Sequence, residues 1–169
     1  GGTQALTTAP IVGTPSTPYP DVYVPGAEAL AAGEIRVTVL GSGDPFIKRS
    51  QASGSLLIEV GNPEKDLFFF DLGSGALANF SSMLLPVEST TKVFLSHLHA
   101  DHIGDIPGLL GSFAKNGRVD PVEIWGGGNE DPELGLGAFV RYMLKAMAWD
   151  TASVRGVRPM SGFQAIAHE

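Results

Sequence analysis

The feature that most constrains this chain is a run of metal-binding side chains, His-Leu-His-Ala-Asp-His, at residues 97–102. A short apolar segment, residues 92–96, precedes the run, and apolar residues at helical spacing follow it over residues 103–113. The pattern therefore predicts a tight loop between a strand and a helix. Three of the four histidines of the chain fall in this run, and the chain has no cysteine. A transition-metal site must accordingly be built from His, Asp and Glu side chains.

The spacing within the run predicts two pairs of metal ligands. His97 and His99 are two residues apart, so both side chains can point to the same side of an extended segment. Asp101 and His102 follow where the chain turns into the helix, and they can point to a neighbouring position. Two pairs suit two metal ions about 3.5–4 Å apart. Imidazole and carboxylate donors favour zinc, with manganese, iron, cobalt and nickel as alternatives. The competing interpretation is a surface histidine cluster in which Asp101 only caps the helix.

Length and composition indicate one globular domain. The chain has 169 residues, of which 43% are hydrophobic and 17% charged, as expected for a folded domain rather than a disordered one. No apolar run is long enough to span a bilayer, so we expect no membrane partner. The formal net charge is -7, and an acidic surface repels polyanions on average. Composition therefore disfavours nucleic acid as a partner.

The chain divides into a leader and a folded part. Residues 1–33 are rich in Pro, Gly and Thr, and the prolines exclude a helix there. We expect a surface leader without a function of its own. The leader has no initiator Met and no signal-peptide pattern, but Gly1 could follow a signal cleavage, which slightly favours a periplasmic or secreted protein over a cytoplasmic one. Within residues 34–169, alternating and apolar segments predict strands, and 3.6-residue spacing predicts helices. The expected strands are residues 35–40, 55–60, 67–71, 92–96 and 122–125, with a last one beginning near 162; the expected helices are 77–84, 103–113 and 131–147.

The histidine run resembles the signature of the metallo-β-lactamase superfamily. Its flanks narrow the resemblance to the ribonuclease Z and arylsulfatase-like branch, because residues 39–57, 70–75 and 102–110 are similar to the segments around the site in that branch. The resemblance covers about residues 35–126. It implies an α/β fold, the αββα sandwich, of which this chain would hold the first half only, within residues 34–169.

The resemblance also implies roles for individual residues. His97 and His99 would hold the first metal ion, and Asp101 and His102 the second, with Asp101 also helping to orient the nucleophile as a catalytic residue. Asp71 would hydrogen-bond near the loop and orient a ligand, although a turn residue at a strand end fits it equally well. The family needs a third His, a bridging Asp and a last His further along the chain. His168 is the only later histidine and is a candidate for the third ligand.

The function implied by the resemblance is a metal-dependent hydrolase with a dinuclear site. A hydroxide generated at the metal ions would attack a small phosphoester, a sulfate ester or a related ester, as in phosphodiesterases and arylsulfatases. We expect activity only when a second chain or fragment supplies the C-terminal half of the fold, with a homo-oligomer as the alternative arrangement. Two other interpretations stay open at this point. The chain could be a catalytically inactive fragment or interaction module, or a metal-dependent oxidoreductase.

Overall fold

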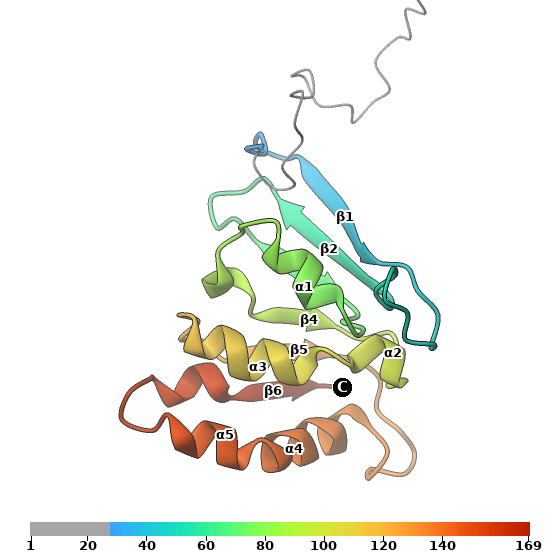
Figure 1. The fold of residues 1–169 in the computed structure, drawn as a ribbon, viewed down its shortest axis with the longest axis vertical. Coiled ribbons are helices and arrows are strands. Elements are labelled where there is room, and N and C mark those ends of the chain that lie inside the picture. The colour runs from blue at the N-terminus through green and yellow to red at the C-terminus, as the bar shows by residue number, and fades with distance from the viewer. Residues whose placement is uncertain (1–27) are drawn as a thin grey trace, which may run out of the picture.

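A computed structural model describes residues 28–169 of the chain (Figure 1). Most of the expected leader, residues 1–33, lies outside the described residues. The folded part is built on one six-stranded sheet whose spatial order follows the chain order, β1 to β6. The strands are β1 Ile35–Gly41, β2 Ser55–Val60, β3 Leu67–Phe70, β4 Lys92–Phe94, β5 Val122–Trp125 and β6 Ala165–His168. The first three strands pair antiparallel, and β3 to β6 pair parallel.

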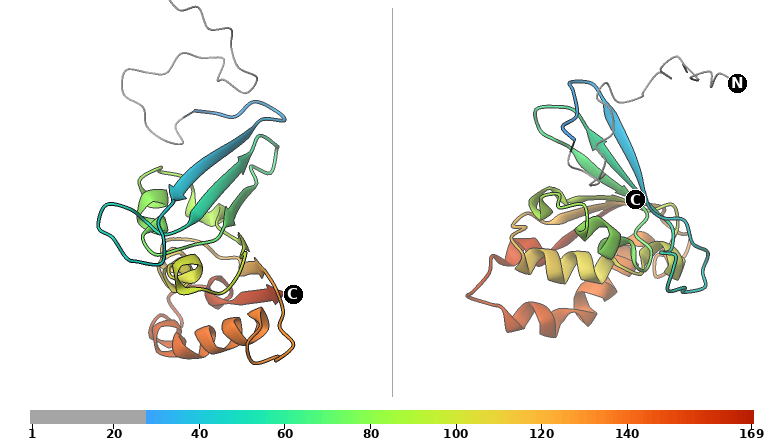
Figure 2. Two further views of the ribbon diagram at one scale, coloured as in Figure 1. Left: turned by 90° about the vertical axis from the view of Figure 1, so that its right-hand side faces the viewer. Right: turned by 45° about the horizontal axis from the view of Figure 1, so that its top comes forward.

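Helices cover one face of the sheet and its β6 edge, as Figure 1 and both views of Figure 2 show. They are α1 Ala76–Ser81, α2 Ala100–Ile103, α3 Ile106–Lys115, α4 Leu136–Ala146 and α5 Ala148–Ser153, with 3-10 turns η1 Val87–Ser89 and η2 Met160–Phe163. The core lies between these helices and the sheet, where Phe69, Val93 and Ile124 are completely buried together with Leu109 of α3. No helix in residues 28–169 is both long and apolar enough to cross a membrane.

The opposite face of the sheet carries a row of stacked rings, one on each of four neighbouring strands. The rings of Phe70 and Phe94 have centroids 5.1 Å apart, those of Phe94 and Trp125 4.7 Å, and those of Trp125 and His168 4.8 Å. Phe70 is 39% exposed, so the described residues leave part of this apolar row open to solvent. A sheet with one buried and one open apolar face agrees with the expected half of a layered sandwich.

The helix after the histidine run is broken, which differs from the continuous helix expected over residues 103–113. Helix α2 ends at Ile103 and α3 begins at Ile106. At Gly104 a Cβ atom would lie 2.2 Å from the hydroxyl oxygen of Ser74, so only glycine fits against this neighbouring loop. The carboxylate of Asp105 is turned towards α1 and accepts a hydrogen bond from the backbone N–H of Leu77 at 2.9 Å. The break therefore packs the loop before α1 against the start of α3.

Helix α4 starts later than the sequence indicates. Asp131, Pro132 and Glu133 have the composition of a helix start, but the Asp131 carboxylate accepts a hydrogen bond from the backbone N–H of Glu133 at 2.9 Å. This side-chain turn competes with the first helical turn. The helix then begins at Leu136.

Candidate functional site

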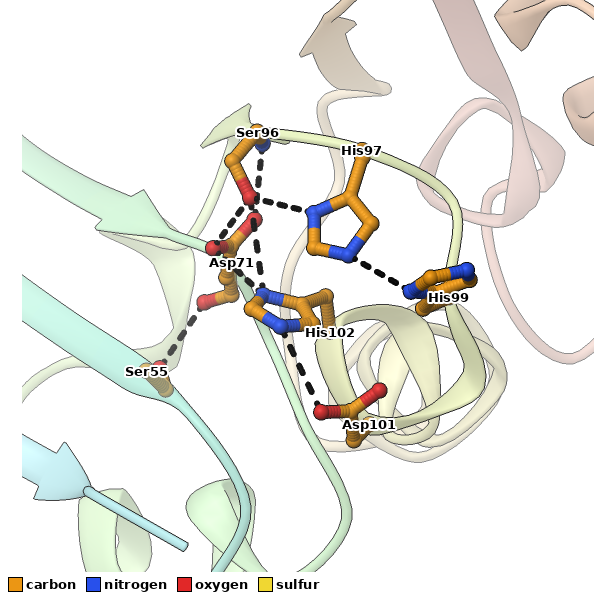
Figure 3. Close-up of polar contacts among 7 residues, drawn as sticks. All are labelled: Ser55, Asp71, Ser96, His97, His99, Asp101 and His102. Carbon is orange, nitrogen blue, oxygen red and sulfur yellow. Dashed lines mark hydrogen bonds and ion pairs between the residues drawn. The ribbon is translucent and has the colours of Figure 1, made fainter. Parts of the chain in front are cut away.

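The candidate site lies at the carboxyl-terminal edge of the parallel strands. Strand β4 ends at Phe94, the chain continues through a loop that contains His97 and His99, and α2 then carries Asp101 and His102. The parallel partner β3 ends at Phe70, which places Asp71 at the same edge. Figure 3 shows these side chains gathered around the loop. The structure thus brings together the four candidate ligands and Asp71.

The side chains of the run lie in two contacting pairs, His97 with His99 and Asp101 with His102. Nε2 of His97 lies 2.9 Å from Nδ1 of His99. Nε2 of His102 lies 3.4 Å from Oδ2 of Asp101. The rings of His97 and His102 have centroids 4.1 Å apart, so the two pairs are neighbours.

Asp71 and Ser96 determine which nitrogen of His102 carries the proton. Oδ2 of Asp71 lies 2.8 Å from Nδ1 of His102. The same carboxylate accepts hydrogen bonds from the Ser96 backbone N–H at 2.8 Å and from the Ser96 hydroxyl at 2.7 Å. Because a carboxylate oxygen only accepts, the His102 proton is placed on Nδ1. Nε2 is then the ring nitrogen that faces Asp101, and in the neutral ring it carries the lone pair.

The same network orients His97. The hydroxyl proton of Ser96 is used for Asp71, so its oxygen accepts from Nδ1 of His97, 3.0 Å away. Nε2 of His97 therefore also keeps its lone pair, and this nitrogen faces His99. Imidazole rings that bind metal commonly donate their second N–H to a carboxylate or another oxygen in this way.

The backbone around Asp71 is shaped to hold the histidine loop. Asp71 has a φ of 56°, a left-handed conformation that is uncommon outside glycine and often marks a functional position. The next residue, Leu72, donates its N–H to the His102 carbonyl at 2.7 Å. At Gly73 a Cβ atom would lie 2.1 Å from the Asp101 carbonyl oxygen, so the two segments are in direct backbone contact there. Sequence reasoning missed Ser96 and Gly73; the glycine-rich run after β3 was the signal available for Gly73.

His168 has partners of its own at the end of β6. Its Nε2 lies 2.9 Å from a carboxylate oxygen of Glu123, and its ring stacks on Trp125. Among the described residues, no hydrogen bond joins His168 to residues 97–102. The structure therefore does not bring it together with the other candidates, and its role as a third ligand stays a prediction.

The chemistry of the donors fits a divalent transition metal. Nε2 of His97 faces His99, and Nε2 of His102 faces Asp101, so each imidazole nitrogen lies beside a second potential metal ligand. The two pairs of side chains are neighbours. Within residues 28–169, however, no three His, Asp or Glu side chains are arranged so that they could hold one metal ion. Each pair offers two donors, whereas a zinc site commonly has at least three protein ligands. The residues present thus fit as part of a metal site.

Comparison with known proteins identifies the family. A family model described as "Anti-Pycsar protein Apyc1" matches residues 35–118. Ribonuclease Z of Methanosarcina acetivorans is 35% identical over 118 residues, which cover 67% of this chain and 38% of the relative. Ribonuclease BN of Proteus mirabilis is 28% identical over 110 residues, 65% of this chain and 34% of the relative. The chain belongs to the ribonuclease Z branch of the metallo-β-lactamase superfamily.

Solved structures show the same fold for this member of the ribonuclease Z branch. The short form of human tRNase Z superposes with a TM-score of 0.57 at 24% identity, over 79% of this chain and 43% of that one. The metallo-β-lactamase fold protein YhfI from Bacillus subtilis gives a TM-score of 0.52 at 25% identity, over 80% of this chain and 47% of that one. The expected α/β metallo-β-lactamase fold, with its first half in this chain, is confirmed. The chain spans less than half the length of each of these relatives.

Two expectations about the substrate are corrected by these relatives. The acidic composition disfavoured nucleic acid and led to a small-molecule ester as the expected partner. That expectation is wrong, because the relatives are named as ribonucleases and a tRNase. Net charge averages over the whole surface and does not describe the local field at a site. The arylsulfatase-like part of the resemblance is not supported by these relatives.

Proposed function

We propose that this chain supplies the metal-binding side of a phosphodiesterase that cleaves RNA. The observation that carries the proposal is the arrangement of His97 and His102, whose Nε2 atoms face a second donor while their Nδ1 atoms are held by Ser96 and Asp71. The names of the relatives, ribonucleases Z and BN and a tRNase Z, support RNA as the substrate. The chain spans less than half the length of these relatives, so the activity is proposed for the whole protein.

The proposed roles follow the two pairs. His97 and His99 would hold one divalent metal ion and Asp101 and His102 a second, with zinc favoured and manganese, iron, cobalt and nickel as alternatives. When bound, such ions supply a nucleophile from water at neutral pH and stabilise charge on the attacked phosphate. Asp71 would act as a positioning residue, because its carboxylate contacts the His102 ring and Ser96.

The proposal is tested with the intact protein, zinc-loaded and then treated with a chelator. We expect cleavage of a transfer-RNA transcript and of bis(p-nitrophenyl) phosphate, with no turnover of p-nitrophenyl sulfate. Chelation should abolish both phosphodiester reactions, and added zinc should restore them. Absence of phosphodiester cleavage at saturating metal, or a preference for the sulfate ester, would contradict the proposal.

Replacing Asp71 with asparagine is expected to lower metal affinity by about 10–100-fold. Asparagine matches aspartate in shape and tolerates the left-handed backbone of this position, so the change removes the charge and not the turn. The measurement is zinc affinity by competition with a chromophoric chelator, together with the visible spectrum of the cobalt form.

The control for this variant is Asp66→Asn at the other end of β3. Asp66 pairs with Lys92 at 2.5 Å, and the hydrogen bond from Lys92 is the main reason that the pKa of its carboxyl lies below its usual range. This variant should leave the cobalt spectrum unchanged. Equal zinc affinities for Asp71→Asn and the wild type would rule out the positioning role.

A further inference from the structure

Two adjoining hollows lie along α4. The first begins beside the histidine loop, and the second lies further from that loop. The first encloses about 460 Å³ and is lined by Leu98, between the two histidines of the first pair, and by Phe139 and Tyr142 of α4. The second encloses about 570 Å³ and is lined by Tyr142, Lys145 and Arg155. Tyr142 lines both hollows, so they meet at this residue and together form a shallow path from Leu98 to Arg155. Figure 1 shows α4 and α5 end to end beside β6.

The far end of this path is positively charged in an acidic chain. Residues 141–164 contain four Lys or Arg and one Asp, which gives this segment a net charge of +3. The whole chain has a net charge of -7, so the remaining residues together carry -10. The acid, Asp150, is paired with Lys115. Lys145, Arg155 and Arg158 are exposed and form no ion pair within the described residues. An uncompensated cluster of this kind attracts phosphate groups.

Aromatic side chains accompany these cations. Trp149 is 82% exposed and Tyr142 51%. Arg141 and Lys145 are four residues apart on α4, and Trp149 follows four residues later on α5. Arg141 and Lys145 thus lie on the same side of α4, and Trp149 lies just beyond them at the start of α5. Cations interleaved with exposed aromatic rings are typical of surfaces that bind single-stranded nucleic acid, because bases stack on the rings and phosphates meet the cations.

Glu133 sets the boundary between the two parts of the path. Its carboxylate accepts hydrogen bonds from Arg141 at 2.8 and 3.0 Å and from the Tyr142 hydroxyl. The hydrogen bond from Tyr142 is the main cause that lowers the pKa of Glu133, so it stays ionised and neutralises Arg141. The free positive charge therefore lies beyond Tyr142, at Lys145 and Arg155.

We propose that Tyr142, Lys145, Trp149 and Arg155, the α4–α5 track, bind an RNA strand that extends from the candidate site. Helix α4 alone is about 16 Å long at 1.5 Å per residue, which corresponds to about five nucleotides of a stacked strand at 3.4 Å each. The track supplies phosphate contacts and stacking positions remote from the histidine loop. The inference rests on the proposed function for the identity of the strand.

The test uses the intact protein and a fluorescently labelled single-stranded RNA, with binding measured by anisotropy over a range of salt concentrations. The charge-reversal variant Lys145→Glu/Arg155→Glu is expected to weaken binding at least about tenfold and to reduce the slope of log affinity against log salt by about two. Trp149→Ala is expected to weaken binding about tenfold with the slope unchanged, since stacking releases no counterions. Lys65→Glu, an exposed lysine in the turn between β2 and β3, is the matched control and should change neither quantity.

Binding and cleavage are measured separately, so that the two proposals can fail independently. RNA binding that depends on the track in a protein without phosphodiesterase activity would refute the proposed function and support the track. RNA binding that the charge reversal leaves intact, or that Lys65→Glu weakens equally, would overturn the track. If the charge reversal leaves RNA binding intact, the cations of the track would instead serve to bind another anion, such as an acidic protein.

Discussion

Replacing His97 with alanine is expected to reduce RNA cleavage at least about 1000-fold, because metal ions contribute several kcal/mol to stabilising charge in the transition state. The fold should survive, since the side chain is exposed and lies in a loop outside the buried core. The readouts are cleavage rate at saturating zinc, zinc content, and the circular dichroism spectrum. The expected combination is lost activity and lost zinc with an unchanged spectrum.

His168→Ala is measured alongside His97→Ala. Comparing the zinc content of the two variants shows whether His168 is also a metal ligand. His168 contacts Glu123 and Trp125, and within residues 28–169 no hydrogen bond joins it to the histidine loop. A loss of zinc equal to that of the His97 variant would assign His168 as a third ligand in the functional protein. Most of the activity remaining in His97→Ala at saturating zinc would remove this residue from the proposed site.

Replacing Arg118 with methionine is expected to destabilise the fold by about 2–4 kcal/mol, through loss of hydrogen bonds to buried carbonyl groups. The side chain is 1% exposed. It donates to the carbonyl oxygens of Leu109 at 2.8 Å and Gly162 at 2.7 Å, and at longer distance to those of Thr90 and Leu110. One cation thus joins α3, the turn before β6 and the segment before β4.

The charge of Arg118 is retained despite its burial. Burial lowers the pKa of the guanidinium to about 10, which leaves it protonated at neutral pH, and no carboxylate is among its hydrogen-bond partners. Methionine keeps a similar length without the charge, so the carbonyl groups lose their donors. The melting temperature should fall by about 10 °C at 2–4 °C per kcal/mol. The exposed Arg49→Met is the control, and an unchanged melting temperature in Arg118→Met would show that the cost of burying the charge cancels its hydrogen bonds.

Sequence periodicity predicted β3 to β5, in which burial alternates along each strand. It also predicted β1, although Ile35, Val37 and Val39 are 57–64% exposed and lie on the open side of that strand. The alternation in β1 and the apolar runs of β3 and β5 are local signals, and the spacing of the histidine run is equally local. The prediction that residues 97–102 hold metal in two pairs rests on that spacing and stays a prediction. Helix α5 and the break at Gly104 depend on contacts with distant segments, such as the one between Gly104 and Ser74, and no local pattern indicates them.

The network around the histidines depends on tertiary structure. Asp71 and Ser96 are 25 residues apart, and they meet because β3 and β4 pair in parallel. A single sequence suggested Asp71 only through the family resemblance and gave no reason to select Ser96. The substrate class was misjudged because net charge averages over the whole chain and does not describe the local field at a site.

The central claim, that His97, His99, Asp101 and His102 bind metal, is tested most directly by zinc-edge X-ray absorption on the intact protein. We expect bound zinc with imidazole nitrogen donors at about 2.0–2.1 Å, together with carboxylate oxygen. The imidazole signal should fall in the His97→Ala and His102→Ala variants. Fully active wild-type protein without bound metal, or a zinc spectrum that these two substitutions leave unchanged, would contradict the account.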